Sequence, residues 1–148
     1  MLQMDHIEIR TAGMADAAAI SELARQLGYP TSIEQAESRL KKALSSRDHE
    51  VLVACVGGPV VGWVHVFLSQ GIASDPFGEI GGLVVAPSHR RRGLGRRLLA
   101  EAEKWAAGRG VTMLRVRSRT ERHAARAFYE VAGFAITKEQ RVFDKYLN

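Results

Sequence analysis

The sequence predicts an α/β (α+β) fold in a single domain over residues 1–148, with a mixed central β-sheet of six to seven strands flanked by about four helices. Strand-like apolar segments and segments of helical apolar periodicity follow one another in the order β-α-α-β-β-β-α-β-α-β-β. In the second half, this order contains strand–helix–strand units, which favour a parallel central pair of strands. A chain of 148 residues is long enough to bury one core of this kind.

The first half of the chain is expected to hold three strands and two helices. Thr31 and Ser32 can cap the second helix. The Gly57-Gly58-Pro59 sequence between two apolar runs is typical of a tight hairpin. The expected elements are a strand at 7–10, helices at 14–27 and from 31 to about 46, and strands near 50–56 and 60–68.

The second half is expected to hold the strand–helix–strand units. Its first helix opens near Gly93 and carries leucines, alanines and a tryptophan at helical spacing until Gly108 and Gly110 end it. The other expected elements are a strand at 77–86 before this helix, a strand at 111–116, a helix at 122–132, and two last strands at roughly 134–138 and 141–147.

Composition narrows the class of protein. Hydrophobic content of 46% and charged content of 25% are ordinary for a globular domain, and no apolar run is long enough to span a membrane. The single cysteine, Cys55, excludes an internal disulfide and fits a reducing cytosol, so we expect a cytoplasmic protein that binds no membrane. The net charge of +5 is compatible with nucleic acid, but an anionic cofactor explains a local cluster of arginines equally well.

A basic turn with two glycines separates the apolar strand that stops at Pro87 from the helix that opens near Gly93. The first backbone N–H groups of a helix have no intrahelical partner, and the helix dipole is positive there. Glycines allow a phosphate to approach the backbone, and arginines bind phosphate with two hydrogen bonds. The turn therefore predicts a polyphosphate site, with a solvated loop or a nucleic-acid patch as the alternatives.

This turn resembles the signature of the GCN5-related N-acetyltransferase (GNAT) family, in which Arg or Gln is followed after two residues by Gly-x-Gly/Ala. The match here is Arg90-Arg91-Arg92-Gly93-Leu94-Gly95, and it follows a strand that ends Leu83-x-Val85-x-Pro87. A second family block appears as Phe128-Tyr129-Glu-Val-Ala-Gly133-Phe134. The resemblance covers essentially the whole chain, and it implies the GNAT fold and an acetyl-CoA-dependent N-acetyltransferase.

The resemblance also implies where acetyl-CoA binds. The pyrophosphate would lie on backbone N–H groups at 91–96, and the pantetheine arm would pair with the strand end at 83–85. That pairing needs a V-shaped opening between this strand and the strand at 111–116. Many relatives have asparagine where this chain has Arg122, which leaves Arg122 to contact phosphate or pantetheine. The implied acetyl-CoA contacts are Leu83, Val84, Val85, Arg90, Arg91, Arg92, Gly93, Leu94, Gly95, Arg96, Arg122 and Phe128.

Two residues are candidates for proton transfer. Glu79 lies on the strand that would present the thioester, and we expect it to act as the general base. Simple alternation places Glu79 on the same face as Phe77, Leu83 and Val85, whereas a β-bulge at Gly81-Gly82 would reverse that parity. Tyr129 is the general acid that the resemblance implies. The alternatives are a hydrogen-bonded glutamate without a catalytic role and a tyrosine packed in the core.

The sequence says less about the acceptor. The resemblance places acceptor contacts in residues 26–32, the 69–77 loop and residues 138–145, and the Gln26–Pro30 stretch looks like that of small bacterial acetyltransferases, including some grouped with aminoglycoside-modifying enzymes. We expect a primary amine of a small molecule or peptide as partner, a homodimer is compatible with the pattern, and no histidine spacing suggests a metal. The alternatives are a non-catalytic acyl-CoA-binding module and, less favoured, a basic nucleic-acid-binding domain.

Overall fold

The computed structural model describes residues 6–148, so residues 1–5 of the predicted domain lie outside the described residues. The chain divides into two compact units, one that extends to Arg117 and one from Ser118 to Asn148. The first unit carries the sheet and, among its described residues, the helices α1, α2 and α3, and the second carries α4.

The first unit is built on a mixed sheet whose strands lie in sequence order, β1-β2-β3-β4-β5. The neighbours from β1 to β4 pair antiparallel, and β4 and β5 pair parallel, as the strand–helix–strand pattern predicted. The strands are β1 (Ile7–Thr11), β2 (His49–Val56), β3 (Val60–Ser69), β4 (Phe77–Val85) and β5 (Leu114–Val116).

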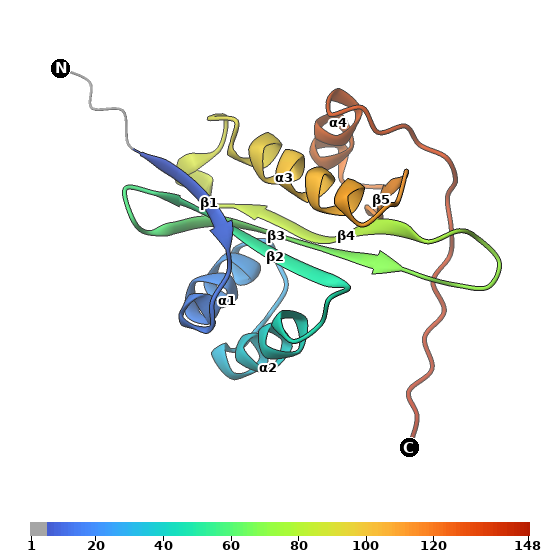
Figure 1. Ribbon diagram of the computed structural model, residues 1–148, viewed down its shortest axis with the longest axis horizontal. Coiled ribbons are helices and arrows are strands. Elements are labelled where there is room, and N and C mark those ends of the chain that lie inside the picture. Colours follow the sequence, from blue (N-terminus) through green and yellow to red (C-terminus); the bar gives the residue numbers. More distant parts are fainter. Residues whose placement is uncertain (1–5) are drawn as a thin grey trace. The chain divides into compact units, whose positions relative to one another are not determined.

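Helices cover both faces of this sheet (Figure 1). A short 3-10 turn, Met14–Asp16, leads into α1 (Ala17–Gln26), which lies with α2 (Ile33–Leu44) on one face, while α3 (Leu94–Gly108) lies on the other. The α2 face is closed by a cluster that includes Leu40 and the fully buried Val53. On the α3 face, Leu98 is fully buried. Burial of a leucine or valine side chain contributes about 1.5–3 kcal/mol, so these layers hold the sheet in place.

The strand that carries Glu79 contains a bulge. On β4, Ile80 lies opposite Val66 and Gly82 lies opposite His65, so Gly81 is an extra residue with no partner in the register. Opposed residues point to the same face of a sheet. Glu79 lies opposite Phe67, whereas Leu83 lies opposite Val64, which points the other way.

This register decides between the two expectations for Glu79. The expectation from simple alternation, a shared face with Leu83 and Val85, is wrong, because the extra residue at Gly81 reverses the parity of everything that follows. The shared face with Phe77 holds, because no bulge separates Phe77 from Glu79. The bulge therefore directs Glu79 away from the face that α3 covers.

The opening between β4 and β5 is present. The two strands pair only from Gly78 to Ile80, against Leu114 to Val116. Within the described chain, the rest of β4, from Gly81 to Val85, has no partner on its β5 side. The β4–β5 pairing therefore ends where the predicted V-shaped opening would begin, and the strand end has no partner strand on this side.

The second unit contains α4 (His123–Val131) and an extended segment from residue 132 onward in which no helix or strand forms. The two last strands predicted at 134–138 and 141–147 are therefore wrong for the described chain, and the described sheet has five strands instead of six to seven. A strand needs a backbone partner and a buried face. This segment forms no strand pairing within the described chain, and its apolar side chains Val142, Phe143, Tyr146 and Leu147 are exposed.

Candidate active site

The basic turn forms a cradle of backbone groups at the start of α3. A 3-10 turn, Pro87–His89, follows β4, and the backbone then takes left-handed conformations at Arg91 (φ 65°) and Gly93 (φ 78°). Gly93 is the N-cap of α3 and has no side chain to bond the first N–H groups of the helix. Successive N–H groups in such a turn form a concave site for an anion, which is what a pyrophosphate requires.

The basic side chains of the cradle are exposed. They are those of Arg90, Arg91, Arg92 and Arg96. Arg90 also donates from Nε to the carbonyl of Val85 over 3.2 Å, so it ties the turn to the end of β4.

Leu94 differs from the arginines around it, because it is 1% exposed and packs against Val56 and Val61. Its side chain anchors the first turn of α3 in the core. Only the backbone N–H of Leu94 is left to meet a phosphate, so its predicted contact with acetyl-CoA is one of backbone alone.

The end of β4 provides the second part of the site. Val84 is buried, and Leu83 and Val85 are half-buried, so the side chains hold the strand while its β5-side edge has no partner strand within the described chain. An extended ligand arm can add to such an edge as a strand would. The strand end and the cradle are continuous in the chain, so one extended ligand could reach both.

Glu79 lies on the face of β4 that points away from α3, and an arginine binds its carboxylate. The guanidinium of Arg117 donates from Nε to Oε2 and from Nη2 to Oε1 of Glu79, both over 3.3 Å. The Glu79 side chain is 15% exposed and that of Arg117 is 53% exposed. The carboxylate is therefore sheltered but reachable, and it binds a cation through both oxygens.

Aromatic rings lie next to Glu79 on this face. Phe67 is its partner on β3, and the ring of His65 lies 5.3 Å from that of Phe67. His65 Nε2 and His49 Nδ1 share a hydrogen bond of 2.9 Å. Burial, with a smaller contribution from His49, lowers the pKa of His65 to about 4. His65 is therefore neutral near pH 7 and adds no positive charge that would repel a cationic acceptor.

Trp63 continues this ring-lined face toward the bulge. A Cβ atom placed on Gly82 would lie 2.7 Å from Cη2 of Trp63, so only glycine allows the indole to lie so close to β4. Trp63 Nε1 is buried, and among the described residues it has no hydrogen-bond partner. The glycines of the bulge therefore make room for rings from β3.

Tyr129 and Phe128, the other predicted site residues, belong to the second unit. The ring of Tyr129 meets Phe128 and Phe134 edge to face, at centroid distances of 5.1 and 5.5 Å. Burial raises the pKa of the Tyr129 phenol above its usual value, so the hydroxyl keeps its proton at neutral pH. Arg122 is the N-cap of α4, and its carbonyl accepts from the N–H of Arg126 over 3.1 Å.

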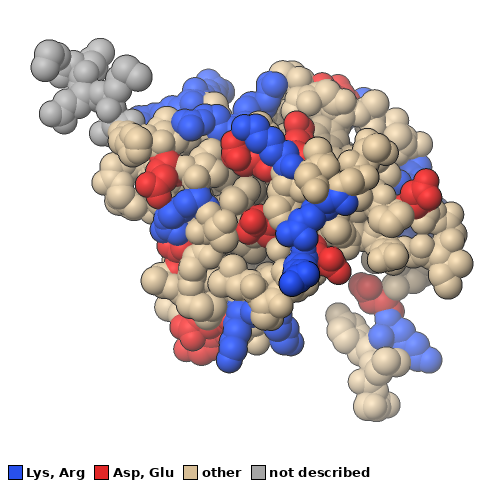
Figure 2. All heavy atoms as spheres, in the orientation of Figure 1, with Lys and Arg blue, Asp and Glu red and all other residues tan. Residues whose placement is uncertain are grey.

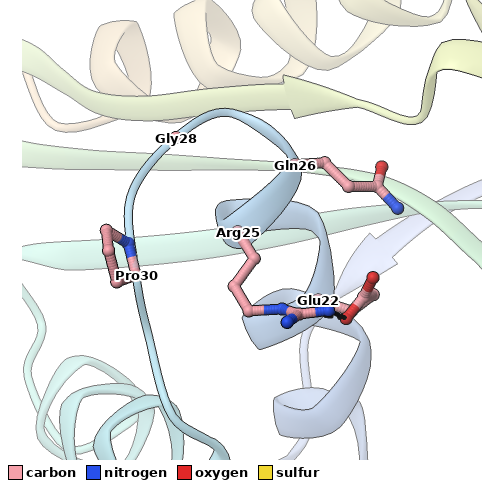
Figure 3. A pocket seen from close by; sticks show the side chains of 5 residues that line it. All are labelled: Glu22, Arg25, Gln26, Gly28 and Pro30. Atoms are coloured by element: carbon pink, nitrogen blue, oxygen red, sulfur yellow. Dashed lines mark hydrogen bonds and ion pairs between the residues drawn. The ribbon is translucent and has the colours of Figure 1, made fainter.

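An open pocket of about 340 Å³ lies where α1 ends (Figure 3). The side chains of Glu22 and Arg25 point toward one another, with Arg25 Nη2 2.6 Å from Glu22 Oε2. The lining residues are Glu22, Arg25, Gln26, Gly28 and Pro30. The pocket therefore overlaps the 26–32 stretch in which acceptor contacts were predicted.

Sequence reasoning missed Arg117 and the pairing of His49 with His65. Arg117 follows β5 and alternates with Arg115, but its approach to Glu79 depends on the register of a parallel pair, which no local pattern encodes. The described residues contain no group of three or more His, Cys, Asp or Glu side chains that could hold a metal. None of their helices is long and apolar enough to cross a membrane. On the face drawn in Figure 2, basic and acidic side chains are interspersed.

Known proteins resemble this chain in sequence. The model of the acetyltransferase (GNAT) family matches residues 17–134. An aminoglycoside N(6')-acetyltransferase type 1 of Stenotrophomonas maltophilia is 33% identical over 135 residues, which cover 88% of this chain and 87% of the relative. The N-alpha-acetyltransferase RimI of Mycobacterium tuberculosis is 35% identical over 121 residues, with coverage of 81% and 73%.

Solved structures share the fold. The aminoglycoside N-acetyltransferase AAC(6')-Iy in complex with CoA superposes with a TM-score of 0.88 over 99% of each chain, at 19% identity. The same enzyme with a bisubstrate analogue, CoA-S-monomethyl-acetylneamine, gives 0.85 over 96% of this chain and 99% of that one, at 20% identity. The solved structures show the shared fold, and the family match together with the relatives in sequence shows that the chain belongs to the GNAT acetyltransferase family and is an N-acetyltransferase.

Proposed function

We propose that this chain transfers the acetyl group of acetyl-CoA to a primary amine of a cationic small molecule of the aminoglycoside class. The observation that carries the proposal is the Glu79 carboxylate, which is sheltered on a ring-lined face of β4 and already binds a cation through both oxygens. The relative from Stenotrophomonas maltophilia supports the same acceptor class. We also propose that both units belong to one domain, since the family match spans their boundary. We place the protein in the cytoplasm, since its one cysteine, Cys55, is a free thiol.

The donor is held by the cradle and the strand end. Backbone N–H groups from Arg91 to Arg96 bind the pyrophosphate, and exposed arginine side chains neutralise its charge. Backbone groups of Leu83–Val85 pair with the amide-bearing arm of the donor. When bound, acetyl-CoA supplies an activated thioester. These contacts bring the thioester to the β4 strand that carries Glu79.

Glu79 removes a proton from the acceptor ammonium, directly or through one water molecule. The freed amine nitrogen attacks the thioester carbonyl carbon, the new C–N bond forms, and the C–S bond breaks. The acylated nitrogen then loses its second proton to solvent, and Glu79 releases the proton it took. Tyr129 gives its phenolic proton to the departing sulfur, and solvent restores it. The amide, free CoA thiol and one proton are the balanced products, and the raised pKa of Tyr129 keeps the acid loaded at neutral pH.

A peptide amino terminus is the second candidate acceptor. The relative from Mycobacterium tuberculosis, an N-alpha-acetyltransferase by name, supports it. A peptide terminus is also a primary ammonium, so Glu79 would bind it by the same chemistry. The two candidates differ in the number of positive charges on the acceptor and in its length.

A thiol-release assay with acetyl-CoA tests the proposal, with neamine and a short peptide with a free amino terminus as acceptors. We expect turnover with neamine and a loss of about 100-fold or more in kcat for Glu79→Gln and for Tyr129→Phe. The matched controls Glu101→Gln and Tyr146→Phe change exposed residues of the same types and should keep wild-type rates. Turnover with the peptide alone would move the assignment to the second candidate, and full activity of Glu79→Gln would remove the base.

A further inference from the structure

Two arginines lie beside Glu79 on one side of the sheet, and they make different contacts. Arg115 is the partner of Glu79 in the β4–β5 register, but its guanidinium lies over the ring of Phe77, 4.3 Å from the centroid. Arg117, two residues further along, places its guanidinium on the carboxylate instead. Equal charges on neighbouring positions therefore have separate partners, one a ring and one the carboxylate.

The contact between Arg117 and Glu79 joins two nitrogen atoms to both carboxylate oxygens, but it is long. Both hydrogen bonds measure 3.3 Å, whereas charge-assisted N–H···O bonds are typically about 2.7–2.9 Å. The Arg117 side chain is 53% exposed, so water can solvate its guanidinium once it moves away. An ion pair with one half-exposed partner is held weakly, and a second cation can replace that partner.

The Glu79 carboxylate depends on its ion pair more than the exposed Arg117 guanidinium does. The Glu79 side chain is only 15% exposed, with Phe67 opposite it on β3 and the neutral His65 on that same neighbouring strand. A sheltered carboxylate loses solvation and gains from a paired positive charge. The site therefore favours an occupied state, with either the protein's own guanidinium or the ammonium of an incoming acceptor.

We propose that Arg117 is a built-in competitor of the acceptor: its guanidinium covers Glu79 in the enzyme without acceptor, and a cationic amine must displace it before Glu79 takes the proton. This rests on the proposed role of Glu79 as the base. Arg117 is then a specificity-determining residue. A polycationic acceptor displaces the guanidinium, whereas a neutral or weakly basic amine leaves it in place and does not react.

Steady-state kinetics with neamine and acetyl-CoA test this in two matched variants. Arg117→Gln removes the competitor, so we expect the KM for neamine to fall about two- to five-fold with kcat unchanged, the range that a weak ion pair allows. Arg115→Gln removes the same charge from the same strand face but breaks only the contact with Phe77, so it should keep the wild-type KM. A lower kcat or a higher KM in Arg117→Gln would overturn the proposal, because Arg117 would then support the reaction.

Chemical complementation provides the sharper test. In Arg117→Ala, added methylguanidinium should bind Glu79 and inhibit competitively against neamine, raising the KM back toward the wild-type value. The neutral molecule methylurea should not do so, and Arg115→Ala should be insensitive to both. Equal effects of the two additives, or equal sensitivity of the two variants, would exclude a specific cation site at Glu79.

A readout independent of activity separates this proposal from the proposed function. The Nε–H resonance of Arg117, assigned by its loss in Arg117→Gln, should shift when neamine is added to wild type and should be shifted beforehand in Glu79→Gln. If neamine displaces Arg117 in wild type but Glu79→Gln keeps full turnover, then Arg117 competes with the acceptor and Glu79 is not the base. An unchanged resonance in the presence of saturating neamine would overturn the displacement itself.

Discussion

Gly81 lies directly beneath the imidazole of His65. A Cβ atom on Gly81 would be 2.6 Å from Nδ1 and 3.2 Å from Cε1 of that ring, and 3.2 Å from Cε1 of Phe67. The His65 ring cannot simply move aside, because it is hydrogen-bonded to His49 and packed against Phe67. The bulge in β4 and the pairing of His65 with His49 therefore both require glycine at position 81.

Gly81→Ala should destabilise the protein by about 1–3 kcal/mol, the usual cost of forcing atoms into a packed site. Urea unfolding measures the free energy of unfolding. Gly71→Ala is the matched control, since a Cβ there meets no atom within 4 Å. It should change stability by less than about 0.5 kcal/mol. Equal stability of the two variants would contradict the contact between Gly81 and His65.

The low pKa of His65 predicts a loss of stability in mild acid. His65 has a pKa of about 4 in the folded state, below its ordinary value of 6.5. Between these two pH values, His65 is therefore protonated in the unfolded chain and neutral in the folded protein. Its contribution is therefore complete above pH 6.5 and is lost as the pH falls toward 4, by up to about 1.4 kcal/mol per pH unit. Burial raises the pKa of Glu50, which works in the opposite direction, so a variant difference is needed.

The measurement is the free energy of unfolding at about pH 7 and about pH 5, in wild type and in His65→Phe. Phenylalanine keeps a ring in the stack but removes the titrating group, so the variant should lose less stability between the two pH values. His123→Gln changes an exposed histidine and should follow wild type. An identical pH dependence in wild type and His65→Phe would refute the assignment.

Gly93→Ala should weaken both stability and CoA binding. Gly93 has a φ of 78° at the N-cap of α3, a conformation that costs an L-residue about 1–2 kcal/mol. Gly110 has a φ of 84° just after the same helix, and a Cβ atom on either glycine would meet no atom within 4 Å. Gly110→Ala should therefore lose similar stability but keep its affinity for CoA, as measured by calorimetry. Parallel loss of affinity in both would argue against the cradle.

Ser32→Ala should lower stability by about 1 kcal/mol, because it removes the cap of α2. Ser32 Oγ accepts from the N–H of Gln35, and Gln35 Oε1 accepts from the N–H of Ser32, each over 3.0 Å. Thermal unfolding checks the loss. Gln35→Ala removes the reciprocal bond to the N–H of Ser32 but keeps the cap bond from the N–H of Gln35 to Ser32 Oγ, so it should cost less. A larger cost for Gln35→Ala would place the cap elsewhere.

Local patterns predicted the parts of this protein that local physics determines. The cap at Ser32, the turn at Gly57–Gly58 and the backbone cradle around Gly93 all depend on residues a few positions apart. The bulge was visible as an alternative, because two adjacent glycines in a strand suggest one. Which alternative holds depends on the pairing of β4 with β3, which is a long-range property.

The features that sequence reasoning missed or predicted wrongly are non-local. Arg117 meets Glu79 across 38 positions of sequence, and His49 meets His65 across 16. The two last strands had the right local pattern but found no partner within the described chain, so apolar alternation alone did not make them strands. The roles of Glu79 and Tyr129 remain predictions that the kinetic variants test.

The short pairing of β4 with β5 has a consequence for solubility. Beyond Ile80, the β4 edge has no partner strand on its β5 side within the described chain, and such an edge is a template for pairing with another molecule. A donor substrate that adds to this edge also shields it. The protein without acetyl-CoA should therefore aggregate sooner on heating than the protein with acetyl-CoA bound.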